Sequence, residues 1–143
     1  MKRIKFSISI LLLVILTGCT NVNKKPEYIF DINIKDCKIL KEEDTHGGFH
    51  GDGEYYLEVS CDKKEITTWK KLPLSDELQK FYNNNLEDKI PNIKEGYYHF
   101  IDRHDEAKNR TSDIELNKRA SYNFSIAFYD TKTNKIYLYE LDT

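Results

Sequence analysis

The sequence predicts an α+β fold in a single small domain, a twisted antiparallel β-sheet with one or two short helices. Three observations lead to this prediction. Several runs alternate apolar and polar residues, which is the period of a half-buried strand. One central segment shows helical spacing, and the chain closes with a strand, a turn-rich segment and a second strand. Antiparallel sheets with segregated helices form the α+β class.

The N-terminal segment precedes this domain and has the composition of a leader. Lys2, Arg3 and Lys5 give it a positive start, and the following segment 6–16 is apolar. That length is typical of a signal-peptide core, and it is shorter than the roughly 20 residues that cross a bilayer as a helix. The leader ends in the motif Leu16-Thr17-Gly18-Cys19.

This motif resembles the lipobox of bacterial lipoproteins, in which a small residue precedes a cysteine. The resemblance implies that residues 1–18 are a lipoprotein signal peptide and that Cys19 receives a diacylglycerol. Residues 19–27 are then the lipidated cysteine and a tether. Two acyl chains anchor stably where one is marginal, so the resemblance implies a protein anchored by lipid on the extracytoplasmic face of the cell membrane. The alternative is an ordinary cleaved signal peptide or an uncleaved anchor.

Residues 28–143 are expected to form the domain. Removal of the leader leaves 125 of the 143 residues, enough for one domain of common size and too few for two. The leader holds three of the 22 basic residues and none of the 24 acidic ones, so the remainder carries a net charge of −5. Nucleic-acid binding needs clustered Lys and Arg. We therefore expect no nucleic-acid partner, and membrane attachment through the lipid alone.

The domain begins with two predicted strands. The segment 28–40 alternates, with Phe30, Ile32 and Ile34 at even positions. After Asp36 the apolar positions become odd-numbered, which predicts a β-bulge near Asp36. The segment 55–61 is the next alternating run.

Two cysteines are left once Cys19 is assigned to lipid. One antiparallel register places Cys37 opposite Cys61 and Ile39 opposite Val59, which puts apolar partners on one face. Disulfides persist outside the cytoplasm, so a Cys37–Cys61 bond is predicted. The alternative is a pair of free thiols that bind metal or act in redox chemistry, although no Cys-x-x-Cys spacing is present.

A short helix is predicted over 76–83. Ser75 is its expected N-cap, two acidic residues follow it, and Leu78, Phe81 and Tyr82 recur at helical spacing. Three asparagines at 83–85 are expected to end the helix.

Three strands are predicted in the second half. The first covers 97–102, and the charged segment 103–120 after it has weak helical or loop character. The other two, 121–129 and 136–141, form a hairpin around the turn-rich segment 130–135.

Four histidines are the side chains best suited to site chemistry, and they fall in two short segments. His46 and His50 lie in the glycine-rich segment 44–53, and His99 and His104 lie in the segment 99–104. Four glycines within seven residues exclude a helix there. The connection 41–53 is therefore predicted to be a long loop, and loops of that length are usually functional or disordered.

Three interpretations of these residues stay open. The first is a divalent metal site, such as zinc, with nitrogen and oxygen ligands. Its candidate ligands are His46, His50, His99, His104, Asp44, Asp52 and Asp102. The second is structural, with Asp and His side chains satisfying the loop backbone and a salt bridge between Asp102 and Arg103. The third is a metal-free ligand or peptide site in the same place. No standard zinc spacing is matched.

Nucleophilic catalysis has little support. There is no Gly-x-Ser-x-Gly elbow and no unpaired cysteine beside a histidine, so no catalytic residue is assigned. A hydrolase built on carboxylates stays open. Trp69, the only tryptophan, is interpreted as a core anchor, with a surface anchor for a partner as the alternative.

Four stretches, 44–53, 69–75, 96–104 and 123–130, together resemble an uncharacterised family of small exported proteins and lipoproteins of low-GC Gram-positive bacteria. The resemblance implies no activity and no catalytic residue. It does favour a shared role for the glycine-rich loop and the segment 96–104.

Three functions follow. We expect first a lipid-anchored binding protein of the cell envelope with a protein partner, of the immunity or exclusion type for example. The second is an envelope hydrolase that uses the His46/His50 loop and the His99/His104 segment. The third is a metal- or small-ligand-binding module at the same residues.

Overall fold

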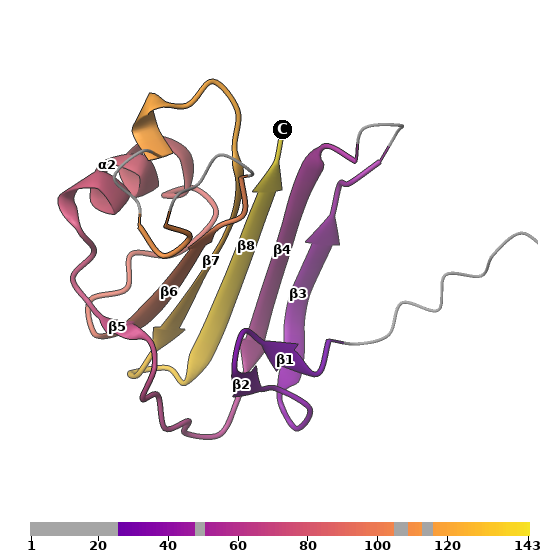
Figure 1. Cartoon of the computed structure of the whole chain (residues 1–143). Coiled ribbons are helices and arrows are strands. Elements are labelled where there is room, and N and C mark those ends of the chain that lie inside the picture. The colour runs from indigo at the N-terminus through magenta and orange to yellow at the C-terminus, as the bar shows by residue number, and fades with distance from the viewer. Residues whose placement is uncertain (1–25, 48–50, 105–108, 113–115) are drawn as a thin grey trace, which may run out of the picture.

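The structure is a computed structural model, and it describes residues 26–47, 51–104, 109–112 and 116–143. This part of the chain is mostly antiparallel sheet, with one α-helix and one 3-10 turn, in a single small domain (Figure 1). The elements are β1 (Tyr28–Ile29), β2 (Ile32–Asn33), β3 (Lys38–Asp44), β4 (Gly53–Ser60), β5 (Lys70–Lys71), α2 (Asp76–Asn85), β6 (Gly96–Asp102), the 3-10 turn (Leu116–Lys118), β7 (Asn123–Asp130) and β8 (Lys135–Asp142). Six strands form a sheet in the order β3-β4-β8-β7-β6-β5, and β1 pairs with β2 alone. The predicted antiparallel sheet is confirmed.

The prediction of one strand over 28–40 is wrong. Its first part is the small β1–β2 hairpin, in which Phe30 takes the left-handed φ of 51°. A turn then follows, closed by the Cys37 amide, which donates to the Ile34 carbonyl at 3.0 Å. The apolar positions therefore change from even to odd numbers where the β1–β2 hairpin ends and β3 begins.

The bulge lies in β3, not near Asp36 as predicted. The register shifts at Leu40, between the pairs that Ile39 and Lys41 form with β4. β3 continues to Asp44 because its backbone pairs with β4 although its side chains are mostly exposed. The connection to β4 is consequently 45–52, shorter than the predicted 41–53.

The predicted disulfide is present. Cys37 and Cys61 are bonded, with their Cα atoms 4.4 Å apart. Ile39 lies opposite Val59, as the predicted register requires. The bond joins the start of β3 to the end of β4.

Helix α2 follows the predicted pattern at its start. The Ser75 hydroxyl accepts a hydrogen bond from the Leu78 amide at 3.3 Å, and Leu78, Phe81 and Tyr82 are buried. The helix runs two residues past the predicted end, and the Leu86 amide still donates to the Tyr82 carbonyl at 2.8 Å. Burial of Leu86 outweighs the weak helix propensity of the exposed asparagines before it.

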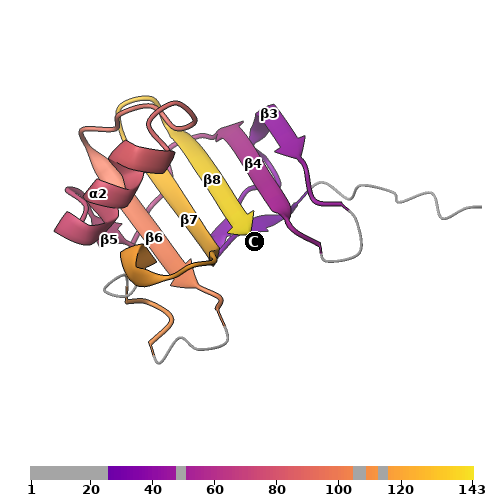
Figure 2. The same cartoon turned by 90° about the horizontal axis from the view of Figure 1, so that it is seen from above.

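The sheet has two different faces. One carries aromatic side chains of β6, β7 and β8, such as Phe124 and Phe128, and packs on α2. Figure 2 shows α2 lying over the side of β5, β6 and β7 and away from β3 and β4. The other face carries Ala127, Ile136 and Leu138 and packs on the β1–β2 hairpin and Trp69. Trp69 is only 5% exposed, so its interpretation as a core anchor is confirmed.

The β1–β2 hairpin reaches only one end of this second face. It lies at the end where β3 begins and β4 ends (Figure 1). Towards the other end of the same face, the apolar side chains give way to Ser125, Glu140 and Asp142. We call this region, with Glu42, Asp44, His46, Tyr55 and Arg103, the polar end of the sheet.

Candidate functional site

The polar end is assembled by strand register. Ser125 pairs with Glu140 across β7 and β8, and Glu140 pairs with Tyr55 across β8 and β4. Tyr55 in turn pairs with Asp44 on β3. Opposed residues of a sheet point to the same face, so these four side chains form one row across four strands.

Hydrogen bonds hold two carboxylates of the polar end in place. The Ser125 hydroxyl donates to Glu140 Oε1 at 2.7 Å, and the Tyr55 hydroxyl donates to Glu42 Oε1 at 2.8 Å. Ser125 is buried, whereas Glu42 is exposed. Burial raises the pKa of the Tyr55 phenol, and the neighbouring Glu42 carboxylate adds to this effect. The two hydroxyl donors orient the carboxylates.

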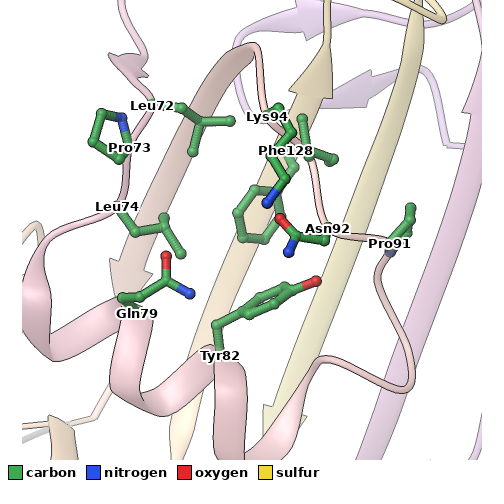
Figure 3. A pocket seen from close by; sticks show the side chains of 10 residues that line it. Leu72, Pro73, Leu74, Gln79, Tyr82, Pro91, Asn92, Lys94 and Phe128 are labelled. Atoms are coloured by element: carbon green, nitrogen blue, oxygen red, sulfur yellow. The ribbon is translucent and has the colours of Figure 1, made fainter.

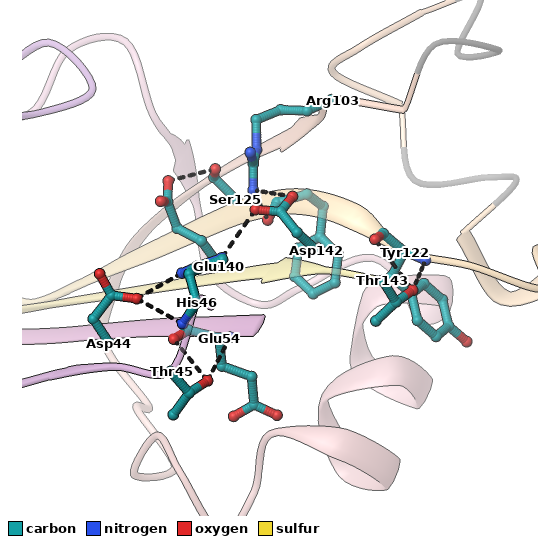
Figure 4. A network of polar contacts seen from close by, with 11 residues as sticks. Asp44, Thr45, His46, Glu54, Arg103, Tyr122, Ser125, Glu140, Asp142 and Thr143 are labelled. Atoms are coloured by element: carbon teal, nitrogen blue, oxygen red, sulfur yellow. Dashed lines mark hydrogen bonds and ion pairs between the residues drawn. The ribbon is translucent and has the colours of Figure 1, made fainter. Parts of the chain in front are cut away.

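His46 joins the loop 45–52 to the end of β8 (Figure 4). Its Nδ1 lies 2.7 Å from Asp44 Oδ1, and its Nε2 lies 3.1 Å from Asp142 Oδ2. The His46 backbone amide also donates to Asp44 Oδ1 at 2.9 Å. Both ring nitrogens can donate only when the imidazole is protonated. The geometry therefore matches the imidazolium form of His46.

A glycine permits this close approach. A Cβ atom at Gly53 would lie 2.6 Å from both the backbone nitrogen and the Cα of His46, so only glycine leaves room for the loop here. Beside it, the Thr45 hydroxyl accepts from the Glu54 amide at 2.8 Å. The loop is thus fixed to β4 next to His46.

Arg103 completes the network on the other side of Asp142. Its Nη2 lies 3.0 Å from Asp142 Oδ1 and donates to the Phe124 carbonyl at 3.1 Å. The predicted salt bridge between Asp102 and Arg103 is wrong. Asp102 pairs instead with Arg119 and is 2% exposed.

The contacts of His46 shift two pKa values in opposite directions. The hydrogen bond to Asp44, together with that to Asp142, raises the pKa of the His46 imidazole above its ordinary 6.5. The hydrogen bonds from the His46 backbone and ring lower the pKa of the Asp44 carboxyl. Each shift favours the charged form of its group, the imidazolium of His46 and the carboxylate of Asp44.

The polar end carries an excess of negative charge. This region contains the carboxylates of Glu42, Asp44, Glu140 and Asp142, and its positive groups are the Arg103 guanidinium and the His46 imidazole. Both positive groups are already engaged with Asp142. Glu42 and Glu140 have hydroxyl donors as their described hydrogen-bond partners. A cationic group would find two oriented carboxylates here.

Among the described residues that were predicted to bind a metal, Asp44 and His46 are in contact through their side chains, whereas Asp102 contacts the backbone amide of His104. Both His46 nitrogens face carboxylates, so neither has a lone pair free for a metal while the ring is protonated. Within the described residues, no group of three or more His, Cys, Asp or Glu side chains is arranged to hold a metal ion.

The other predicted ligands lie elsewhere. His99 packs against Phe30, with ring centroids 4.5 Å apart, and burial lowers the pKa of His99. Asp102 lies on the α2 side of the sheet, opposite Phe124. The His104 amide donates to Asp102, and its ring Nε2 lies 3.4 Å from the Ser121 hydroxyl.

Three predicted residues remain. Asp52 is exposed, and His50 and Cys19 lie outside the described residues. The metal assignment and the lipidation of Cys19 therefore stay predictions.

Sequence reasoning missed most of the polar end. Glu140, Asp142, Ser125 and Arg103 were not among the predicted site residues. The predicted hairpin around 130–135 could have indicated part of this site, because its register pairs Ser125 with Glu140.

The described part of the chain contains no helix long and apolar enough to cross a membrane. No family model, curated protein or solved structure matches this chain. The resemblance to small exported proteins stays a prediction.

Proposed function

We propose that this protein is a lipid-anchored binding protein on the extracytoplasmic face of the cell membrane, and that the polar end of its sheet contacts a cationic protein partner. One observation carries the proposal. Four carboxylates, those of Glu42, Asp44, Glu140 and Asp142, gather at the end of a sheet face that the β1–β2 hairpin does not reach. Within this proposal the domain belongs to the α+β class, because its helix is segregated to one face of an antiparallel sheet.

Oriented carboxylates at an exposed surface favour this function. The hydroxyl groups of Ser125 and Tyr55 hold Glu140 and Glu42 in position, so these side chains lose little rotational freedom on binding. Complementary charge speeds the encounter with a partner and selects it by sign. A partner rich in Lys or Arg matches this surface.

The lipobox motif supports the location. Leu16-Thr17-Gly18-Cys19 follows a basic and then apolar leader, and Cys37 and Cys61 form a disulfide that suits an extracytoplasmic compartment. Labelling of cells with a radioactive fatty acid tests the anchor. We expect label on the protein and none on a Cys19→Ser variant. Equal labelling of both would contradict the anchor and leave the binding surface untouched.

Binding of a short oligolysine peptide, followed by NMR, tests the surface. We expect chemical-shift changes centred on Tyr55, Ser125 and Glu140. A Glu42→Gln/Glu140→Gln variant keeps both hydrogen-bond acceptors and removes two charges, so affinity should fall at least about fivefold.

A charge-matched variant provides the control. Glu65 and Glu95 are exposed and lie away from the polar end. Glu65→Gln/Glu95→Gln lowers the net negative charge by the same amount, and it should retain most of the affinity. Equal losses in the two variants would mean that peptide binding follows net charge only, and the proposed surface would be wrong.

A further inference from the structure

A hollow of about 160 Å³ lies on the opposite side of the sheet from the polar end. It is enclosed by the start of α2, the segment that leads into it and the segment 91–94 (Figure 3). Its apolar wall includes Leu72, Leu74 and Phe128. A cavity of about 150 Å³ with such a lining is large enough to hold a benzene ring.

The walls of the hollow are held by contacts within the fold. The Leu72 amide donates to the Gly96 carbonyl at 3.0 Å, and the Tyr82 hydroxyl donates to the Ile90 carbonyl at 2.6 Å. Pro73 and Pro91 restrict the backbone at two sides. A preformed hollow of this kind binds a ligand with little ordering cost.

Polar groups of the lining favour an anion. Lys94 is the only lining residue with a charged side chain, and among the described residues it has no ion pair. Figure 3 shows its side chain directed toward the hollow, near Asn92. This cation stands in a protein whose formal net charge is negative.

Two amides of the lining, those of Gln79 and Asn92, add hydrogen-bonding capacity. Gln79 donates through Nε2 to Asn83 at 2.8 Å, which leaves its carbonyl oxygen as an acceptor. Asn92 has both a donor and an acceptor. An apolar hollow with a cation and two amides at its margin matches a ligand with an apolar body and a polar, anionic end.

We infer that this hollow binds an apolar carboxylate. The aromatic or branched body of the ligand fills the space against Phe128, and its carboxylate pairs with Lys94. The C-terminal residue of a peptide and a free carboxylic acid share this chemistry. The inference does not rest on the polar end, because it uses other residues on the other face.

Titration of the purified full chain with N-acetyl-L-phenylalanine, followed by NMR, tests this inference. The neutral N-acetyl-L-phenylalaninamide is the matched probe. We expect saturable shifts at 72–74 and 91–94 with both probes, and about fivefold weaker binding of the amide. The absence of saturable shifts in these segments, or equal affinity for the two probes, would overturn the inference.

Charge variants locate the carboxylate. Lys94→Gln should weaken binding of the acid to the level of the amide and leave the amide unchanged. Lys132→Gln removes a charge from an exposed turn outside the hollow, and it should leave both affinities unchanged. An equal effect of the two variants would contradict the pairing with Lys94.

Two further probes distinguish the sources of the carboxylate. If the hollow binds a peptide C-terminus, a longer peptide that ends in phenylalanine should bind more tightly than 3-phenylpropionate. If it binds a free acid, 3-phenylpropionate should bind at least as tightly. Failure of both probes to bind would overturn the inference, whatever the result of the oligolysine titration.

Discussion

Two histidines on the same sheet face stand in opposite environments. His46 lies between the carboxylates of Asp44 and Asp142, which favour its charged form. His99 packs against Phe30 and lies 5.9 Å from Trp69 between ring centroids, and burial disfavours its charge. The two pKa values therefore move in opposite directions, and the two residues make opposite contributions to stability as pH changes.

The raised pKa of His46 predicts stabilisation at acidic pH. A folded-state pKa above 6.5 means that the contribution is fully present below 6.5 and is lost as pH rises through the folded-state value. The melting temperature of the wild-type protein should exceed that of His46→Gln most at acidic pH, by a difference worth at most about 1 kcal/mol. Thermal melts at several pH values measure it, and a gap that widens with rising pH would contradict the prediction.

The lowered pKa of His99 predicts the reverse. Its contribution is fully present above 6.5 and is lost as pH falls toward the folded-state pKa. A His99→Leu variant keeps an apolar contact with Phe30 and removes the titrating group. It should therefore lose less stability than the wild type on acidification, as measured by the same melts. Parallel curves for the two proteins would disprove the assignment.

At the scale of elements, alternation predicted strands well and junctions poorly. The runs 97–102, 121–129 and 136–141 are strands within one or two residues of the predicted bounds. The segment 28–40 alternates equally well, yet it contains a hairpin and a turn. The chain reverses direction between β1 and β2 because Phe30 takes a left-handed conformation, which its residue type does not predict.

Gly96 at the start of β6 provides a test of element packing. A Cβ atom there would lie 1.9 Å from the Tyr129 carbonyl oxygen, and the φ of 156° disfavours a side chain. Gly96→Ala should lower the free energy of unfolding by more than about 2 kcal/mol, measured by urea denaturation. Gly47→Ala is the control, since its nearest contact would be 3.9 Å and it should change stability little. Similar losses in both variants would contradict this packing.

At the scale of the whole molecule, the candidate site depends on the order of strands in the sheet, which local sequence patterns do not predict. The structure places His99 and Asp102, both predicted metal ligands, on opposite faces of β6. The contact between His46 and Asp142 could not be predicted from the sequence, because the two residues are far apart along the chain and are brought together by the pairing of β8 with β4. Strand order, rather than local pattern, creates the polar end.

The Cys37–Cys61 disulfide lies within the core that packs on the β1–β2 hairpin and Trp69. Cys37 and Cys61 are 24 residues apart, and closing a loop of this length is worth roughly 2–4 kcal/mol. Reduction should lower stability by that amount in urea denaturation. A Cys37→Ala/Cys61→Ala variant should be insensitive to reductant. An unchanged wild-type midpoint after verified reduction would contradict the stabilising role.

Site-directed photo-crosslinking in host cells tests the central claim most directly. A photoreactive amino acid in place of Ile101, beside Ser125 on the face of the polar end, should capture a basic protein. The same group in place of Tyr28, which is 53% exposed on the hairpin, is the control and should not capture it. The product should disappear with Glu42→Gln/Glu140→Gln and persist with Glu65→Gln/Glu95→Gln. A product that forms equally from both positions, or that survives loss of Glu42 and Glu140, would contradict the account.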